Sequence, residues 1–363
     1  MPVVKAFCVR VPKRRGEEVR WLLSERGLLR RDVRARADSN FVYLPLEGLK
    51  EEVEKVLKGA SPALEFEFLI EDFEAVRRET VEGLLGFRPS YEVVGDIAVI
   101  TALPLCDDEA EERQVAERAA AAILKVHKNV KVVVRRASAV SGVYRTRRFE
   151  IIAGERRTET VHKENGFKFL VDLERAYFNP RLGYERARVS ALVKGGETVV
   201  DMFAGVGTFA IQVARRAARV IAIDINPDAI CYLRRNLELN KVTNVEVLEG
   251  DVRELSKRLR GIADRIIMNL PHDAFALLEN ALEMAKDGCV LHYYAVKSAV
   301  DAGGGKVRSS EGVRKAIGAA VEELRGGVEA HGFRCEILNA RRVKQYAPHA
   351  YIVAVDAKIG GRA

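Results

Sequence analysis

Residues 197–240 constrain the fold most strongly, because they carry two short apolar runs separated by a glycine-rich turn and a helical stretch. The runs at 199–202 and 220–223 are typical of buried strands, and 208–216 between them is predicted to be a helix. From Pro180 onward, such runs keep alternating with helical stretches of about a dozen residues. This order is typical of βαβ units around a parallel sheet, so we predict an α/β, Rossmann-like domain.

The turn and the second run carry residues expected to bind a cofactor. Gly205 and Gly207 let the backbone approach a ligand at the N-terminus of the helix. Asp224 follows Asp201 by 23 residues and lies at a strand end, where it can accept both hydroxyls of a ribose. The alternative for Asp224 is an Asx-type turn with Asn226. Because the carboxylate of Asp201 would repel a pyrophosphate, we expect a cationic ligand that contains a ribose.

The string "DMFAGVG" followed by an acidic strand end resembles the motif of class I methyltransferases, which bind S-adenosylmethionine. In that class an acid placed like Asp251, in "GDVRE", usually contacts the adenine amino group. The position also suits the N-cap of the helix that "VRELSKRL" predicts. Both roles are compatible with the sequence.

The stretch "DRIIMNLPHD" places Asn269, Leu270 and Pro271 at the end of the fourth predicted strand of this sheet. Ligands of open α/β sheets bind outside the carboxyl ends of the strands, so this stretch is expected beside the methyl donor. Asn-Leu-Pro-His keeps the second proline of the D/N-P-P-Y/F signature for methylation of exocyclic amines, but lacks its first proline and its aromatic residue. That interpretation is weakened and stays open.

The N-terminal half of the chain predicts two further units and a basic surface. Residues 1–72 alternate strands and helices, residues 71–86 are polar and predicted to be helical, and a second unit begins near Pro89. Residues 131–190 hold 14 Lys or Arg and 7 Asp or Glu, whereas the rest of the chain is nearly neutral. Such a local excess favours a polyanionic partner, and its alternative is a solvated basic face.

Cysteine spacing and hydropathy narrow the class of protein. The five cysteines form no CxxC pair, so no metal site or disulfide framework is expected. No apolar run is long enough to cross a membrane, and we expect a cytoplasmic protein without a membrane partner.

The remaining motifs resemble one family. The strings "VVGDIAVI", "HKENG", "VDLERAYFNPRLGYERARV", "DMFAGVGTFAI", "AIDINP", "DVRE", "MNLP", "HYY" and "KQYAPHAYIVAVD" occur in its order between about 90 and 356. The family is that of archaeal and eukaryotic tRNA (guanine-N1)-methyltransferases acting at position 37. The resemblance implies a monomer that binds tRNA at the anticodon stem-loop and the elbow. It also implies an N-terminal tRNA-binding domain at 1–72, a basic α+β middle domain at 80–178 and a catalytic domain at 179–363.

The resemblance also implies the roles of individual residues. Glu185 is the general base at guanine N1, and Arg145 stabilises the charge that develops on O6, with Asn269 as a third catalytic residue. Cofactor contacts are expected from Tyr177, Asp201, Phe203, Gly205, Gly207, Asp224, Ile225, Asp251, Val252 and Asn269, and substrate contacts from Arg145, Pro271, Arg181 and Arg186. The alternatives are helix-dipole stabilisation for Glu185, a phosphate contact for Arg145 and core packing for Tyr177.

Two other functions stay open from the sequence. A wyosine-pathway enzyme would act on the same nucleotide, either by methylating a carbon of a tricyclic guanosine derivative or by transferring the aminocarboxypropyl group. Relatives of the second kind depart from Asn-Leu-Pro, which this chain keeps at 269–271. An inactive RNA-binding module on a methyltransferase fold is the third possibility, since fold does not imply activity.

Overall fold

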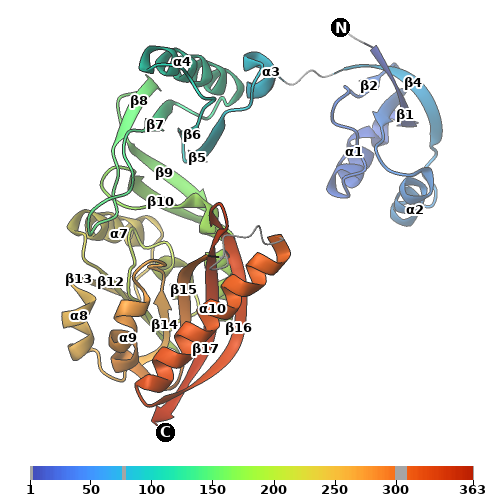
Figure 1. Ribbon diagram of the computed structural model, residues 1–363. Coiled ribbons are helices and arrows are strands. Elements are labelled where there is room, and N and C mark those ends of the chain that lie inside the picture. The colour runs from blue at the N-terminus through green and yellow to red at the C-terminus, as the bar shows by residue number, and fades with distance from the viewer. Residues whose placement is uncertain (1–2, 76–78, 299–308, 363) are drawn as a thin grey trace. The chain divides into compact units, whose positions relative to one another are not determined.

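The computed structural model describes residues 3–75, 79–298 and 309–362, which form two compact units, Met1–Gly86 and Phe87–Ala363. The first unit contains a four-stranded antiparallel sheet in the order β2-β3-β1-β4 (Figure 1). Its described elements are β1 Val3–Pro12, α1 Gly16–Glu25, β2 Arg36–Ala37, β3 Phe41–Pro45, α2 Lys50–Ala60, β4 Glu67–Glu74 and α3 Val81–Leu85.

The prediction of a helix over residues 71–86 is largely wrong. Strand β4 continues to Glu74 and pairs with β1, with Phe73 buried in the core. From Glu71 to Glu74 burial alternates residue by residue, with Phe73 buried and Asp72 and Glu74 exposed, which is the pattern of a half-buried strand and not of a helix. The only helix there is α3, and residues 76–78 lie outside the described part of the chain.

The second unit begins with a smaller four-stranded sheet in the order β5-β6-β7-β8. Asp108 caps the helix beside it by accepting a hydrogen bond from the backbone N–H of Glu111. A separate hairpin follows, whose turn residues Asn165 and Gly166 both have positive φ, as such turns require. The elements are β5 Ser90–Val94, β6 Ile97–Ala102, α4 Glu109–Val126, β7 Val132–Arg136, β8 Phe149–Gly154, β9 Glu159–Glu164 and β10 Phe167–Asp172.

A seven-stranded sheet forms the rest of the second unit and confirms the predicted Rossmann-like α/β fold. Its order is β13-β12-β11-β14-β15-β17-β16, in which β11 to β15 run parallel and the last two strands form an antiparallel hairpin. The elements are α5 Gly183–Leu192, β11 Thr198–Asp201, α6 Ala210–Ala214, β12 Arg219–Asp224, α7 Pro227–Leu239, β13 Val245–Glu249, α8 Val252–Leu255, β14 Ala263–Met268, α9 Leu278–Met284, β15 Ala285–Ser298, α10 Ser309–Ala330, β16 Phe333–Ala347 and β17 Ala350–Arg362.

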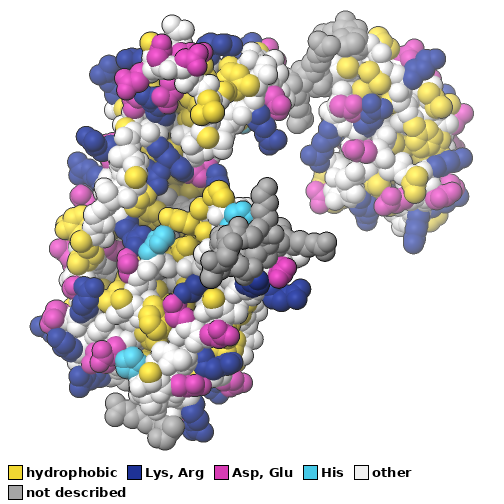
Figure 2. Space-filling model, viewed as in Figure 1, with side chains coloured by type: hydrophobic (Ala, Val, Ile, Leu, Met, Phe, Trp, Pro, Cys, Tyr) yellow, Lys and Arg dark blue, Asp and Glu magenta, His cyan; other side chains and the backbone are white. Residues whose placement is uncertain are grey.

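This sheet carries the main core on both of its faces. Buried residues of α9 and α10 pack on one face and those of α6 and α7 on the other. Among the described residues, no helix is long and apolar enough to cross a membrane. In Figure 2, apolar side chains and Lys or Arg side chains gather between the smaller sheet and the tip of the β16–β17 hairpin, which is where the candidate site lies.

Candidate functional site

Two buried carboxylates lie at the carboxyl ends of neighbouring strands β11 and β12. Asp201 is fully buried, and no side chain among the described residues pairs with its carboxylate, which only the backbone N–H groups of Phe203 and Ala210 face. Burial raises the pKa of Asp201 to about 7. Burial also raises the pKa of Asp224, which accepts the backbone N–H of Gly205 at 2.7 Å and of Asn226 at 2.9 Å. A buried carboxylate without a cationic partner is costly, and a cationic ligand would relieve that cost.

The glycine-rich turn lies next to these carboxylates and is specified by sterics. Gly207 has a φ of 91°, and a Cβ there would lie 2.3 Å from Cδ1 of Leu233, so only glycine fits. Gly205 has a φ of 55° and lies near the backbone oxygen of Tyr177. The residues present therefore fit a ligand that combines a ribose with a positive charge.

The other predicted cofactor contacts surround the same strand ends in different environments. Ile225, directly after Asp224, keeps 38 % of its surface exposed, whereas Val252 is buried and Phe203 packs against the core. Asp251 caps α8 by accepting the backbone N–H of Arg253 at 2.9 Å. The N-cap alternative for Asp251 is thus present, and its other carboxylate oxygen pairs with the Arg253 guanidinium at 3.0 Å.

The Asn-Leu-Pro loop follows β14 at the same edge of the sheet. Its backbone is fixed, because the Leu270 carbonyl accepts the N–H groups of Asp273 and Ala274 and the Pro271 carbonyl accepts that of Val296. The side-chain amide of Asn269 has no hydrogen-bond partner among the described residues. A rigid loop therefore presents an amide whose donors and acceptor are free for a ligand.

Arg145 joins the segment between β7 and β8 to this loop. Its Nη2 atom lies 2.5 Å from Oδ2 of Asp273, and its φ of 53° is uncommon for a residue with a Cβ. From the β16–β17 hairpin, the Tyr346 ring packs edge-on against that of His272, with centroids 4.9 Å apart. Three segments that are far apart in sequence thus meet at the end of β14.

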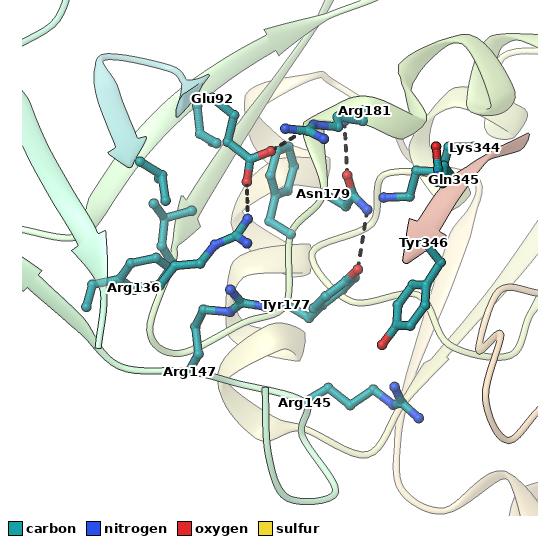
Figure 3. Close-up of a pocket in the computed structure, with 15 residues that line it drawn as sticks. Glu92, Arg136, Arg145, Arg147, Tyr177, Asn179, Arg181, Lys344, Gln345 and Tyr346 are labelled. Atoms are coloured by element: carbon teal, nitrogen blue, oxygen red, sulfur yellow. Dashed lines mark hydrogen bonds and ion pairs between the residues drawn. The ribbon is translucent and has the colours of Figure 1, made fainter. Parts of the chain in front are cut away.

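A cavity of about 230 Å³, here called the arginine pocket, opens beside these contacts (Figure 3). Arg145, Tyr177 and Arg181 are among its lining residues, whereas Glu185, Asn269 and Pro271 are not. Arg181 is paired with Glu92 at 3.1 Å, and the Tyr177 hydroxyl receives the Asn179 amide at 3.4 Å. Its full lining is Glu92, Val94, Val99, Arg136, Arg145, Arg147, Phe149, Leu173, Tyr177, Phe178, Asn179, Arg181, Lys344, Gln345 and Tyr346.

Glu185 lies in the first turn of α5, as predicted, with 1 % of its surface exposed. Its Oε1 atom accepts hydrogen bonds from Arg188 at 2.7 Å and from the Tyr294 hydroxyl at 2.8 Å. Its Oε2 atom accepts no hydrogen bond from a described residue and forms an ion pair with Arg341. One carboxylate oxygen is therefore anchored, and the other faces a single cation.

A chain of buried polar groups extends from Glu185 across the sheet, and sequence reasoning missed it. Arg188 bridges Glu185 to Asp356, and Asp356 lies 2.5 Å from Nδ1 of His292. The chain ends with Arg265, which lies 2.7 Å from Nε2 of His292 and 2.8 Å from Glu197. Together these residues form the Glu185 network, consisting of Glu185, Arg188, Asp356, His292, Arg265 and Glu197.

The hydrogen bonds of the Glu185 network fix its charges. Because Arg265 can only donate, Nε2 of His292 accepts and its proton lies on Nδ1, facing Asp356. Burial lowers the pKa of His292 and keeps the ring neutral. Burial alone would raise the pKa of Asp356, but the hydrogen bonds from His292 and Arg188 outweigh it and hold that pKa below its usual range. The sequence does contain one signal for this network: His292 and Asp356 are polar residues inside the otherwise apolar runs "VLHYYAV" and "YIVAVDA".

The structure does not support a direct substrate contact for Arg186. Its guanidinium is buried, 2.5 Å from Oε2 of Glu164 and 2.6 Å from the backbone oxygen of Asn179. Glu164 belongs to the "HKENG" string, so this pair ties the β9–β10 hairpin to the start of α5. A group enclosed in this way acts on substrate only by positioning its neighbours.

Comparison with known proteins adds two kinds of relative. The profiles of the TRM5/TYW2 methyltransferase domain, the tRNA methyltransferase 5 N-terminal domain and the TYW2 N-terminal domain match residues 160–320, 8–57 and 74–158. The tRNA (guanine(37)-N(1))-methyltransferase Trm5b of Pyrococcus abyssi is 37 % identical over 97 % of this chain and 99 % of its own. Its crystal structure matches with a TM-score of 0.68, covering 98 % of this chain and 100 % of that one.

A related structure and a second activity complete the comparison. The complex of aTrm5 with tRNALeu matches with a TM-score of 0.64 at 33 % identity, over 97 % of this chain and 99 % of that one. The tRNA 4-demethylwyosine(37)-methyltransferase Taw21 of Saccharolobus solfataricus is 34 % identical, over 74 % of this chain and 92 % of its own.

Proposed function

We propose a role for each residue of the site on the premise that the chain belongs to the TRM5/TYW2 methyltransferase family. It is an S-adenosylmethionine-dependent tRNA (guanine(37)-N(1))-methyltransferase. The observation that carries the site assignment is the Arg145–Asp273 ion pair, which brings the basic segment to the Asn-Leu-Pro loop beside the two buried carboxylates.

The strand ends of β11 and β12 hold the cofactor. When bound, S-adenosylmethionine supplies the methyl group that N1 receives. Asp201 offsets its positive charge and Asp224 accepts the ribose hydroxyls, while Gly205 and Gly207 let the backbone lie close to it. Ile225 provides the exposed apolar surface on which the adenine packs, and Asp251 is the candidate for its amino group.

Glu185 is the base that removes the N1 proton. Guanine N1 carries a proton at neutral pH and becomes a nucleophile only when that proton leaves. The proton moves to Oε2 of Glu185, because Oε1 is already occupied by Arg188 and Tyr294. Arg341 must leave Oε2 for this to happen, so entry of the nucleotide exchanges one ion pair for a proton transfer.

Arg145 stabilises the negative charge that appears on guanine O6 as the N1 proton leaves. Its guanidinium has five donors, of which Asp273 engages one of the two on Nη2. Donors held in place before the reaction cost no reorganisation when charge develops. Asn269 and Pro271 hold the ring of the guanine, which must leave the anticodon loop to reach these groups.

The wyosine-pathway alternatives have less support. Two relatives with those names match 74 % of this chain, whereas the Trm5b enzymes of Pyrococcus abyssi and Methanocaldococcus jannaschii match 97 % of it, and an N-terminal domain profile of that family matches residues 8–57. An inactive module is disfavoured by the partly buried amide of Asn269 and the buried carboxylate of Asp201, neither of which has a side-chain partner among the described residues. A decayed site has no reason to keep them.

The decisive experiment is nucleoside mass spectrometry of tRNA transcripts incubated with the full-length protein and S-adenosylmethionine. A transcript with G37 is expected to yield 1-methylguanosine, and one with A37 in its place is expected to yield no methylated nucleoside. Equal methylation of both transcripts would contradict the assignment. A transcript that carries 4-demethylwyosine at position 37 tests for a second substrate.

A further inference from the structure

The arginine pocket contains more positive charge than its own acids can neutralise. Five cationic side chains line it, from Arg136, Arg145, Arg147, Arg181 and Lys344, whereas Glu92 is its only acidic residue among those described. Glu92 is already shared between Arg136 at 2.9 Å and Arg181 at 3.1 Å. Asp273, outside the pocket lining, engages Arg145.

Arg147 and Lys344 are left over by this pairing. Neither side chain forms a hydrogen bond or an ion pair with any residue in the described part of the chain. Both are partly buried, Arg147 between β7 and β8 and Lys344 near the tip of the β16–β17 hairpin. Burial, with neighbouring cations, lowers the pKa of both, so each positive charge is held at a cost that an anion would remove.

The rest of the pocket indicates which anion this is. The rings of Tyr177 and Tyr346 are about half exposed and line the same cavity, so aromatic surface and unpaired cations stand together. In Figure 3, Arg147 and Lys344 approach Tyr177 and Asn179 from opposite sides. The volume of about 230 Å³ is below the ~300 Å³ at which sites for drug-sized ligands begin, so it admits part of one nucleotide and no folded element of RNA.

We propose that Arg147 and Lys344 bind a backbone phosphate of the tRNA directly next to the nucleotide that is methylated. Arg147 presents a planar fork that suits two phosphate oxygens, and Lys344 presents a point charge from the other side. Such contacts fix the register of the strand without reading its sequence. They would hold the backbone while Tyr177 and Tyr346 contact the base or its neighbour, which places the guanine relative to Arg145.

This inference rests on the proposed function and has a separate readout. Arg147→Met and Lys344→Met remove the charge and keep the side-chain length, and Arg156→Met is the matched control, because Arg156 is exposed, unpaired among the described residues and outside the pocket. For each variant, tRNA affinity is measured by filter binding over a series of KCl concentrations. Affinity for S-adenosylmethionine is measured by calorimetry.

Each pocket variant is expected to lower the slope of log affinity for tRNA against log salt by about 1, with no change in the control. Affinity for S-adenosylmethionine is expected to stay within about threefold, because neither side chain is proposed to contact the cofactor. Unchanged tRNA slopes, or slopes lowered equally in Arg156→Met, would overturn the proposal. Loss confined to S-adenosylmethionine affinity would also overturn it, since the anion would then be the cofactor's carboxylate.

A second measurement identifies the phosphate. Synthetic anticodon stem-loops carry one neutral methylphosphonate each, at successive positions around guanosine 37. One position is expected to weaken binding to the wild-type protein about as much as Arg147→Met does, and the two changes combined are expected to cost no more than either alone. Additive losses at every position would contradict the proposal. If the wild-type protein formed no 1-methylguanosine in a stem-loop without methylphosphonate, the proposed function would be contradicted instead.

Discussion

The Glu185 network and the arginine pocket belong to the same unit but treat their charges in opposite ways. In the network every charged group has a partner at hydrogen-bond distance, from Glu185 through Arg188, Asp356 and His292 to Arg265 and Glu197. In the pocket, Arg147 and Lys344 have none among the described residues.

The difference separates groups that hold a shape from groups that await a ligand. Burying an unpaired charge costs several kcal/mol, and in a fully paired network the partners offset this cost without a ligand. Unpaired cations in a cavity keep this cost until an anionic ligand binds, and a polyanion is such a ligand. Glu185 ends the network, because Oε1 is bound by Arg188 and Tyr294 whereas Oε2 faces only Arg341.

The largest expected effect comes from removing the base at this end of the network. Glu185→Gln keeps the shape of the side chain but cannot accept the N1 proton, so kcat is expected to fall by about 10³-fold, within the range for general-base catalysis. Affinity for S-adenosylmethionine, measured by calorimetry, is expected to stay within about twofold. A kcat within tenfold of wild type would remove Glu185 from the mechanism and leave the network as a structural feature only.

The next effect concerns the cation between the pocket and the Asn-Leu-Pro loop. Arg145→Met is expected to lower kcat by about 10²-fold, the scale for loss of one electrostatic donor. Asp273→Asn keeps a hydrogen-bond acceptor for Arg145 and serves as the matched control, with kcat within about threefold. If only tRNA affinity fell, Arg145 would be a phosphate contact, as is proposed for Arg147 and Lys344.

A smaller effect is expected when the network is broken behind the base. Asp356→Asn leaves Arg188 with one carboxylate and is expected to lower kcat about tenfold, with KM for tRNA unchanged, because Glu185 is less firmly oriented. The unfolding free energy is expected to fall by about 3–5 kcal/mol, as for a broken buried pair. Rapid-quench kinetics and urea denaturation measure the two quantities.

The pH dependence of the unfolding free energy tests whether Asp356 is ionised in the folded protein. Because the pKa of Asp356 lies below its usual range in the folded protein, its stabilisation is complete above the unfolded pKa of about 3.9 and is lost as pH falls below that value. The stability gap between wild type and Asp356→Asn is therefore expected to be constant above about pH 5 and to shrink in acid. A gap that widens in acid would contradict the charge assignment of the network.

The last prediction concerns cofactor binding and leaves the methylation step untouched. The pKa of Asp201 is raised to about 7 by burial, so binding a cation there requires loss of its proton near neutral pH. S-adenosylmethionine affinity is expected to rise about tenfold between pH 6 and pH 8, and Asp201→Asn is expected to bind more weakly with a flat profile. Calorimetry in buffers of different ionisation enthalpy counts the released proton. An equally steep profile in the variant would assign the titration elsewhere.

The sequence predicted the parts of the site that depend on local order. The glycine turn, the acidic strand ends and the position of Asn269 follow from strand and helix periodicity, and Glu185 falls in the first turn of its helix as expected. Each of these features lies within a few residues of the sequence pattern that predicts it. The same holds for the sheet, although α6 spans Ala210–Ala214 and is shorter than the predicted helix at 208–216.

What the sequence could not predict depends on partners far away along the chain. Asp356 meets Arg188 from 168 positions away, and Lys344 lies in the same pocket as Arg147 only because the last hairpin folds over the middle of the unit. The family resemblance implied a substrate contact for Arg186, but its guanidinium is buried against Glu164, a partner 22 positions away. Only the three-dimensional arrangement tells a paired charge from an unpaired one.

The most direct test of the central claim is the pH dependence of single-turnover methylation by wild type and Glu185→Gln, with 1-methylguanosine at position 37 as the product. If Glu185 removes the N1 proton, the variant's rate rises with pH as solvent takes over that role, and its deficit relative to wild type narrows. A deficit of the same size at every pH would contradict this account, since Glu185 would then act without accepting the proton.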